Sequence, residues 1–246
     1  MDKIISLKDI KKLYHTDKEE IMALNNISFD VYNGEFISIV GPSGCGKSTI
    51  LSILSNLIDK SDGTININEN IKISYMLQKD SLFPWRTILD NCLLGIELNN
   101  NLNVENKQLV ISLLKKYGLE NFITSYPNSL SGGMRQRVAL IRTLAVNPDI
   151  LLLDEPLSAL DYQTRLEIGN DIYEIIKNEK KTVIMVTHDI GEAISMSDRV
   201  IVFSKRPASI KNIYNINYEQ RKTPMENRNS KEFNNYFNLI WRDLNE

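Results

Sequence analysis

The chain has 246 residues, of which 42% are hydrophobic and 24% charged, and its formal net charge is −2. This composition is typical of a soluble globular protein and excludes a disordered chain, and such a balance of charge gives no electrostatic reason to expect a nucleic-acid partner. Two cysteines cannot form a disulfide framework, so we expect Cys45 and Cys92 to be free thiols in a reducing cytosol. The N-terminal segment lacks the apolar stretch of a signal peptide, and no apolar run approaches the roughly 20 residues of a membrane-spanning helix.

A glycine-rich segment follows the apolar strand predicted at Phe36–Val40 and leads into a helix-like stretch at 48–57. Residues 41–49 match G-x-x-x-x-G-K-[ST], with the strand before and the helix after that confirm a phosphate loop. Glycines let successive backbone N–H groups face phosphate oxygens, and the helix adds its positive end. We predict that Lys47 binds the β- and γ-phosphates and that Ser48 ligates Mg²⁺. The predicted nucleotide-binding residues are Gly41, Pro42, Ser43, Gly44, Cys45, Gly46, Lys47, Ser48 and Thr49.

Between about residues 85 and 128 the pattern changes to helices without strands, which predicts an insertion on one side of a sheet. Next, the sequence Leu-Ser-Gly-Gly-Met at 130–134 opens a helix that we expect to run to about residue 146, with Ser131 as its cap. A capped helix alone would explain this turn. It is also a second anion site without a lysine, because the hydroxyl and the first backbone N–H groups are donors for phosphate.

Two later strands end in residues suited to phosphate chemistry. Ile150–Leu153 ends at Asp154 and Glu155, and the strand at 182–187 ends at His188. Strands of an open α/β sheet present ligand-binding side chains at their carboxyl ends. We predict that Asp154 holds Mg²⁺, that Glu155 is the general base for an attacking water, and that His188 contacts a γ-phosphate. Taken singly, these residues could be a helix cap and an exposed histidine, so the prediction depends on the phosphate loop.

Short continuous apolar strands that alternate with helices predict a parallel sheet covered on both faces. The tail should end in an amphipathic helix, because its apolar residues recur at helical spacing. We expect this helix to pack against its own domain rather than a membrane surface, since its polar face is not basic. The apolar stripe consists of Phe233, Tyr236, Phe237, Ile240, Trp241 and Leu244.

Taken together and in this order, the motifs resemble the ATP-binding cassette (ABC) family over roughly residues 3–205. The resemblance implies an α/β P-loop NTPase fold of the ABC type, with a mainly parallel sheet core, an antiparallel β portion and an inserted helical subdomain. Within a single domain at 1–246, residues 1–84 and 148–205 would form the nucleotide-binding core. Residues of about 85–147 would form the helical subdomain, and 206–246 the C-terminal tail.

The resemblance also assigns roles to individual residues. Residues 41–49 correspond to the Walker A motif and 150–155 to Walker B, with Glu155 as the catalytic carboxylate. Gln78 corresponds to the Q-loop glutamine, which senses Mg²⁺ and water, and Asp161 ends the D-loop. Tyr14 resembles the aromatic residue that stacks on adenine. The signature segment, which contacts ATP bound by a partner chain, consists of Ser131, Gly132, Gly133 and Met134.

Two positions depart from the family pattern. Asn56 stands where the family usually has glycine after the first helix, and asparagine tolerates the left-handed conformation better than most residues. Met134 replaces the commoner glutamine of the signature and leaves its Ser-Gly-Gly turn intact. We therefore expect ATP binding to be retained.

In the family, two cassettes close head-to-tail around two ATP molecules, so a homodimer is implied. Residues 82–91 resemble the ATPases of nitrate, sulfonate and taurine importers. The implied partners are an integral membrane permease and, indirectly, a solute-binding protein, with the chain peripheral on the cytoplasmic face of the membrane. An importer of thiamine-precursor pyrimidines is an alternative, and a soluble non-transport ABC ATPase is less favoured. Phe83 and Trp85 could either dock the permease or fill the core of the insertion.

Overall fold

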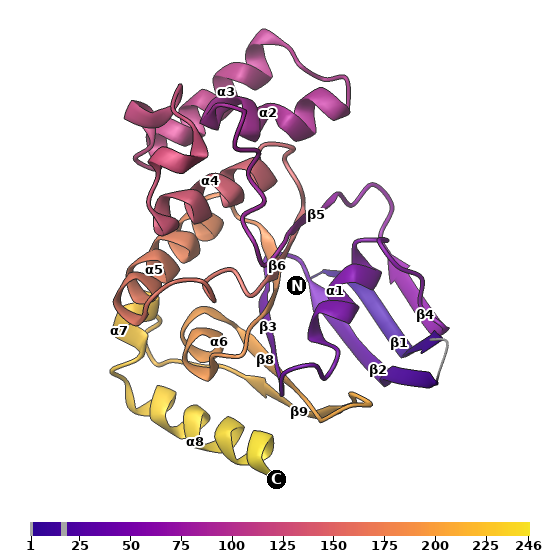
Figure 1. Ribbon diagram of the computed structural model, residues 1–246. Coiled ribbons are helices and arrows are strands. Elements are labelled where there is room, and N and C mark those ends of the chain that lie inside the picture. The colour runs from indigo at the N-terminus through magenta and orange to yellow at the C-terminus, as the bar shows by residue number, and fades with distance from the viewer. Residues whose placement is uncertain (1, 16–18) are drawn as a thin grey trace.

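The computed structural model describes residues 2–15 and 19–246, and a six-stranded sheet lies at its centre (Figure 1). Strands β3, β6 and β7 are buried along their whole length, as expected for a sheet covered on both faces. All neighbouring strands are parallel except the last pair, β8 and β9. The order across the sheet is β5 (Ile73–Met76), β6 (Ile150–Asp154), β7 (Thr182–Val186), β3 (Phe36–Val40), β8 (Arg199–Phe203) and β9 (Ile210–Asn215).

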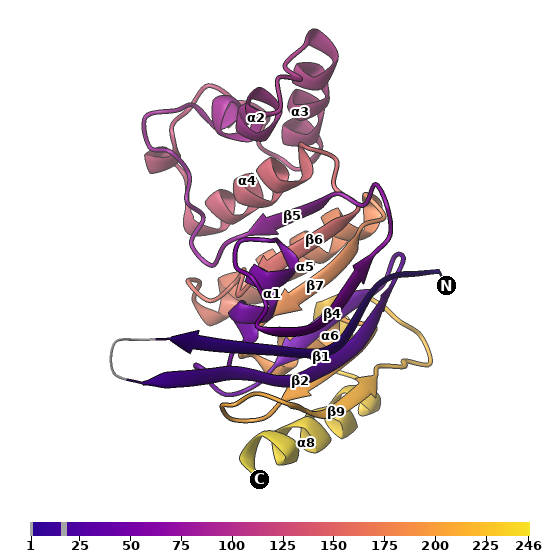
Figure 2. The ribbon, with the colours of Figure 1, turned by 90° about the vertical axis from the view of Figure 1, so that its right-hand side faces the viewer.

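A smaller antiparallel sheet covers one face of the central sheet, and Figure 2 shows it in front. Its strand order is β2 (Glu20–Tyr32), β1 (Lys3–His15) and β4 (Asp62–Ile67). Helix α1 (Lys47–Leu54) contacts β2, β6 and β7, so it lies between the two sheets. Leu51 of α1, Leu24 of β2 and Ile39 of β3 belong to the apolar core that joins these layers. This sheet is the antiparallel portion that the family resemblance implied.

Helices cover the opposite face of the central sheet. Helices α4 (Gly132–Leu144) and α5 (Tyr162–Asn178) form an apolar core with β6 and β7. Above the sheet, α2 (Ile88–Leu98), α3 (Val104–Lys116) and the other side of α4 enclose a separate core, together with 3-10 turns at 120–122 and 127–129. The mixture of a parallel core, an antiparallel portion and an inserted helical part confirms the predicted fold class.

The C-terminal tail returns along the bottom of the central sheet (Figure 1). Helix α6 (Ile190–Met196) contacts α7 (Pro224–Asn227) and α8 (Lys231–Asn245), and α8 also contacts β8 and β9. Phe233 and Ile240 are buried there, so the prediction that the tail helix packs on its own domain is confirmed. Trp241 is an exception, because 56% of it is exposed. In residues 2–15 and 19–246, no helix has the length and apolar character to cross a bilayer.

Candidate nucleotide site

The phosphate loop joins β3 to α1, and its conformation requires glycine at two positions. Gly44 and Gly46 have φ angles of 71° and 124°, which side-chain-bearing residues rarely adopt. A Cβ on Gly46 would lie 2.9 Å from a methyl carbon of Leu24, so the loop also packs closely on β2. Lys47 is buried, and its ammonium group donates to the carbonyl oxygens of Gly41 at 2.8 Å and Pro42 at 3.0 Å. The loop therefore holds a cation inside its own curl, where a phosphate would meet it.

Asp154, at the carboxyl end of β6, accepts two hydrogen bonds beside this loop. The Ser48 hydroxyl donates to Oδ1 and the Tyr75 hydroxyl to Oδ2, each at 2.9 Å. Burial raises the pKa of Asp154, and the hydrogen bonds from Tyr75 and Ser48 oppose that rise. Burial and the neighbouring Asp154 raise the pKa of Tyr75 well above its usual value, so its hydroxyl remains a donor. Our sequence reasoning missed Tyr75, which precedes Gln78 by three residues on β5.

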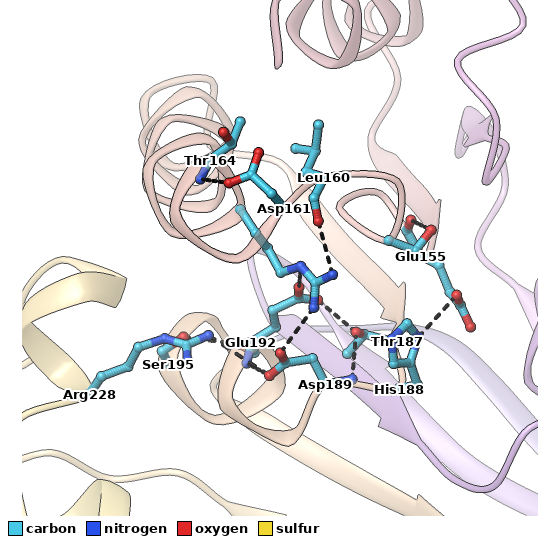
Figure 3. Close-up of polar contacts among 12 residues, drawn as sticks. Glu155, Leu160, Asp161, Thr164, Thr187, His188, Asp189, Glu192, Ser195 and Arg228 are labelled. Carbon is cyan, nitrogen blue, oxygen red and sulfur yellow. Dashed lines mark hydrogen bonds and ion pairs between the residues drawn. The ribbon is translucent and has the colours of Figure 1, made fainter. Parts of the chain in front are cut away.

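Glu155 meets Gln78 and His188 at the carboxyl ends of three neighbouring strands. Its Oε2 accepts a hydrogen bond from Gln78 Nε2 and lies 3.1 Å from each of Gln78 Nε2 and His188 Nδ1. Figure 3 shows His188 directed at the Glu155 carboxylate. Glu155 has a φ of 46°, a left-handed conformation that costs a non-glycine residue energy, and its N–H is fixed by the Val186 carbonyl at 2.8 Å. The surrounding structure holds this carboxylate in a strained position.

A cavity of about 280 Å³ opens over the phosphate loop. Tyr14 and Ala23 line it from the antiparallel sheet, and Glu155 lines it from β6. Tyr14 is partly exposed, and the Lys12 ammonium lies 5.0 Å from the centre of its ring. Arg206, in the β8–β9 connection, also lines the cavity, and no pattern in the sequence had indicated it. The lining thus combines the phosphate loop with residues of the antiparallel sheet and with Glu155.

The signature segment forms the N-terminus of α4. The Ser131 hydroxyl accepts a hydrogen bond from Met134 N–H at 3.3 Å, so the predicted cap is confirmed. A Cβ on Gly133 would lie 2.6 Å from a methyl carbon of Ile168, which explains why glycine is needed where α4 approaches α5. Met134 packs on the apolar core of the helical part, so an apolar side chain fits this position.

Only part of the signature segment approaches the other site residues within one chain. Gly132 lines a second cavity, of about 650 Å³, together with Gln78, Glu155 and His188. In the described part of the chain, no signature residue lines the cavity over the phosphate loop. Asp161 lies apart from both cavities and caps α5 by accepting a hydrogen bond from Thr164 N–H at 3.1 Å, and this bonding lowers its pKa.

The fold and the site define a P-loop ATPase, and known proteins share this fold. Residues 24–158 match the family model described as ABC transporter. The uncharacterized ABC transporter ATP-binding protein YtlC of Bacillus subtilis (strain 168) is 46% identical over 239 residues, covering 94% of this chain and 92% of that protein. The aliphatic sulfonates import ATP-binding protein SsuB of Bacillus anthracis is 36% identical over 227 residues, covering 89% of each.

A solved structure agrees with these relatives. The dimeric post-hydrolysis state of the ATP-binding cassette MJ0796 bound to ADP and Pi has a TM-score of 0.73 and 32% identity, and the match covers 87% of this chain and 100% of that one. The chain therefore belongs to the ABC transporter family and is an ABC-type ATPase.

Proposed function

We propose that this protein is the ATP-hydrolysing subunit of an importer, and that it energises uptake of a small solute through a separate membrane permease. The observation that carries the proposal is the meeting of Gln78, Glu155 and His188 beside the phosphate loop. A carboxylate held next to a phosphate-binding curl can accept the proton of a water that attacks the γ-phosphate. The bond from the γ-phosphorus to ADP then breaks, and Lys47 and the trans signature stabilise the charge.

The residues around Asp154 fit a magnesium ion, because hydroxyl and carboxylate oxygens are the ligands that Mg²⁺ prefers. Ser48 and Asp154 are already within hydrogen-bond distance of one another, and we propose that both, with Gln78, hold the ion. Bound there, Mg²⁺ would neutralise charge on the β- and γ-phosphate oxygens. Tyr14 would stack on the adenine, and the other residues of the loop at 41–49 would surround the phosphates.

We further propose that two copies of the chain share each ATP. The signature turn lies at the N-terminus of α4, and the first backbone N–H groups and positive end of a helix suit an anion from outside the chain. Ser131 is exposed, so a partner can reach it. The solved relative that is titled a dimeric structure supports this arrangement. Asp161 would approach the interface between the copies at the start of α5.

The permease would bind near the segment that follows Gln78. Phe83 and Trp85 stack with ring centres 5.0 Å apart, and 71% of Trp85 is exposed, so the alternative that Trp85 fills the core of the insertion is wrong. The fully buried Asn91 side chain binds the backbone of Phe83, Arg86 and Thr87, which fixes the backbone on both sides of Trp85. A preformed aromatic anchor of this kind suits a protein interface.

A separate groove lies between the sheet edge and the helical part. This cavity of about 720 Å³ is lined from β5, α2, α3 and the α4–β6 connection, and Phe83 and Trp85 do not line it. Its lining residues include Asn99, Asn101, Asn106, Leu109 and Asn147.

The solute class comes from relatives alone. A relative whose name specifies aliphatic sulfonate import supports a small anion such as nitrate, a sulfonate or taurine as the cargo, with thiamine-precursor pyrimidines as the alternative. The permease and a solute-binding protein would contact that cargo, and this chain would act from the cytoplasmic face of the membrane. The net charge of −2 gives no support to a nucleic-acid-directed ATPase.

The test is phosphate release by the purified chain with ATP and Mg²⁺. Lys47→Ala should abolish both ATP binding and hydrolysis, because it removes the cation inside the loop. Lys8→Ala, an exposed lysine on β1, is the matched control and should behave as wild type. Equal hydrolysis by wild type and Lys47→Ala would contradict the proposal.

A further inference from the structure

A network of charged residues passes behind His188 and joins the D-loop to the C-terminal tail (Figure 3). Its centre is the Arg165 guanidinium on α5. Nη2 of this side chain donates to the carbonyl oxygen of Leu160, in the D-loop, at 3.1 Å. Nη1 lies 3.5 Å from Asp189 Oδ2, and Nε lies 3.7 Å from Glu192 Oε1. One side chain thus links the D-loop with the two acids that follow His188.

The two neighbours of His188 are fixed by the same acids. The Thr187 hydroxyl donates to Glu192 Oε2 at 2.6 Å and accepts from Asp189 N–H at 3.0 Å. Asp189 Oδ1 accepts the Glu192 N–H at 2.9 Å and so caps α6. His188 therefore lies between two residues whose side chains are bonded to each other through Glu192. Its position against Glu155 depends on this bonding.

The tail closes the network from the other side. Arg228, which follows α7, has Nη2 3.9 Å from Asp189 Oδ1, and only 18% of its side chain is exposed. Its guanidinium lies over Gly191, where a Cβ would be 2.6 Å from Nη1, and 6.0 Å from the ring of Phe233 on α8. Arg228 is thereby held between the tail helix and the start of α6.

We propose that Arg165 and Arg228 are positioning residues for His188, and that through Asp189 and Glu192 they fix residues 187–189 to the D-loop on one side and to the tail on the other. The tail thereby sets the rate of ATP hydrolysis. This inference rests on the proposed function, because His188 acts only if it contacts the γ-phosphate. None of the network residues lines the cavity over the phosphate loop, so we expect the network to act on the rate of hydrolysis rather than on ATP affinity.

The electrostatics of Glu192 give the network a pH signature. The pKa of this carboxyl is raised to about 7, chiefly by burial; the Thr187 hydrogen bond, Arg165 and Arg228 oppose the rise, and Asp189 adds to it. Among the described residues, these are the charged groups that face it. Removing either arginine lets Glu192 take up a proton at higher pH. The pH range over which hydrolysis depends on a charged Glu192 then moves upward.

The experiment compares Arg228→Gln with Arg242→Gln, a tail arginine whose side chain is 62% exposed and pairs with Glu246 at the end of the chain. Arg228→Gln should lower kcat by roughly two- to thirty-fold, the range of couplings carried by such networks. Its KM and ATP affinity should match wild type, and its pH profile of kcat should shift to higher pH. Arg228→Lys, which keeps the charge, should recover part of the rate. Arg242→Gln should be indistinguishable from wild type in all of these.

If hydrolysis by the wild type requires Lys47 but Arg228→Gln and Arg242→Gln have equal kcat values, the positioning role alone is overturned. Hydrolysis that does not require Lys47 would overturn the proposed function as well. Should Arg228→Gln melt early, Asp189→Asn decides, because asparagine still caps α6 but loses the ion pairs. A reduced kcat with faster hydrogen exchange at 187–196 is expected, and wild-type values of both would overturn the proposal.

Discussion

The phosphate loop and the signature turn are both glycine-containing turns that open a helix, yet only the first has a buried lysine and a neighbouring aspartate beside it. The loop at 41–49 has the buried Lys47 in its curl, and Ser48 reaches Asp154 from an adjacent strand. The turn at 131–134 begins with an exposed serine and caps only itself. The first thus has its cationic and acidic side chains within one chain, whereas we propose that the second receives its ligand from another copy. On this difference we base the proposal of a site shared between two copies.

The largest effect should come from a change beside the phosphate loop that leaves the signature turn intact. Glu155→Gln removes the proposed base and keeps the hydrogen-bonding shape, so hydrolysis should fall by about 10²–10⁴-fold while ATP binding is retained. ATP should then hold the two copies together for longer. Glu69→Gln, an exposed residue before β5, is the control for the change of charge. If Glu155→Gln released phosphate at the wild-type rate, Glu155 would not be the general base.

A change in the signature turn should separate ATP binding from ATP hydrolysis. Ser131→Arg places bulk and charge where the γ-phosphate held by the other copy would approach. ATP binding by the monomer should survive, whereas ATP-dependent dimerisation and hydrolysis should weaken by about tenfold or more, which corresponds to ~1.4 kcal/mol or more. Sedimentation with ATP measures the dimer, and Ser112→Arg on the exposed side of α3 is the matched control. An equal loss of monomer affinity would place Ser131 in its own chain's site.

Glu192 extends the comparison to the residues that follow His188, on the side of the phosphate loop. Its pKa is raised on folding, from 4.5 to about 7, so the folded state binds the proton more tightly. Stability should therefore fall as the pH rises from about 4.5 to about 7, by up to about 3 kcal/mol. Glu192→Gln should remove this loss, so the variant gains relative to wild type towards pH 8. Denaturant unfolding of wild type and Glu192→Gln at pH 5 and pH 8 measures this difference. An equal change in the free energy of unfolding of both proteins between the two pH values would contradict a raised pKa of Glu192.

The smallest effect concerns the segment around Phe83, which we propose as the binding surface for the permease. Phe83→Ala should leave the melting temperature and the intrinsic hydrolysis near wild type but weaken binding to the permease by ~2 kcal/mol or more. Co-purification with a permease from the same gene cluster measures the loss. Tyr126→Ala, another exposed aromatic residue of the helical part, is the control. A clearly lower melting temperature of Phe83→Ala would mean that this ring packs in the core of the helical part instead.

The sequence predicted the parts of the site that lie at strand ends. Asp154, Glu155 and His188 each follow an apolar run, and β6 and β7 are neighbours, so their meeting required only the sheet. Asn56, expected to tolerate a left-handed helix end, has a φ of 59°. These features are local, and local patterns predict them well.

The residues that were missed depend on contacts between distant segments. Tyr75 on β5 reaches Asp154 on the neighbouring strand β6, 79 residues later in the sequence, and Arg206 enters the cavity from a connection with no motif. The long strands β1 and β2 have irregular register, with Asp9 at a φ of 52°, so their period-two pattern is broken. Trp241 follows a buried position on α8 yet faces solvent, because spacing alone does not set the width of the packed stripe.

The shared site can be tested most directly by mixing two inactive chains, Lys47→Ala and Ser131→Arg. In a head-to-tail dimer of one copy of each, one site combines both defects, and the other combines an intact phosphate loop with an intact signature turn. Phosphate release should therefore reappear on mixing, with a maximum near equal proportions of the two chains. If each chain used its own signature turn, both sites of the mixed dimer would stay defective, and the absence of any recovery would contradict the account.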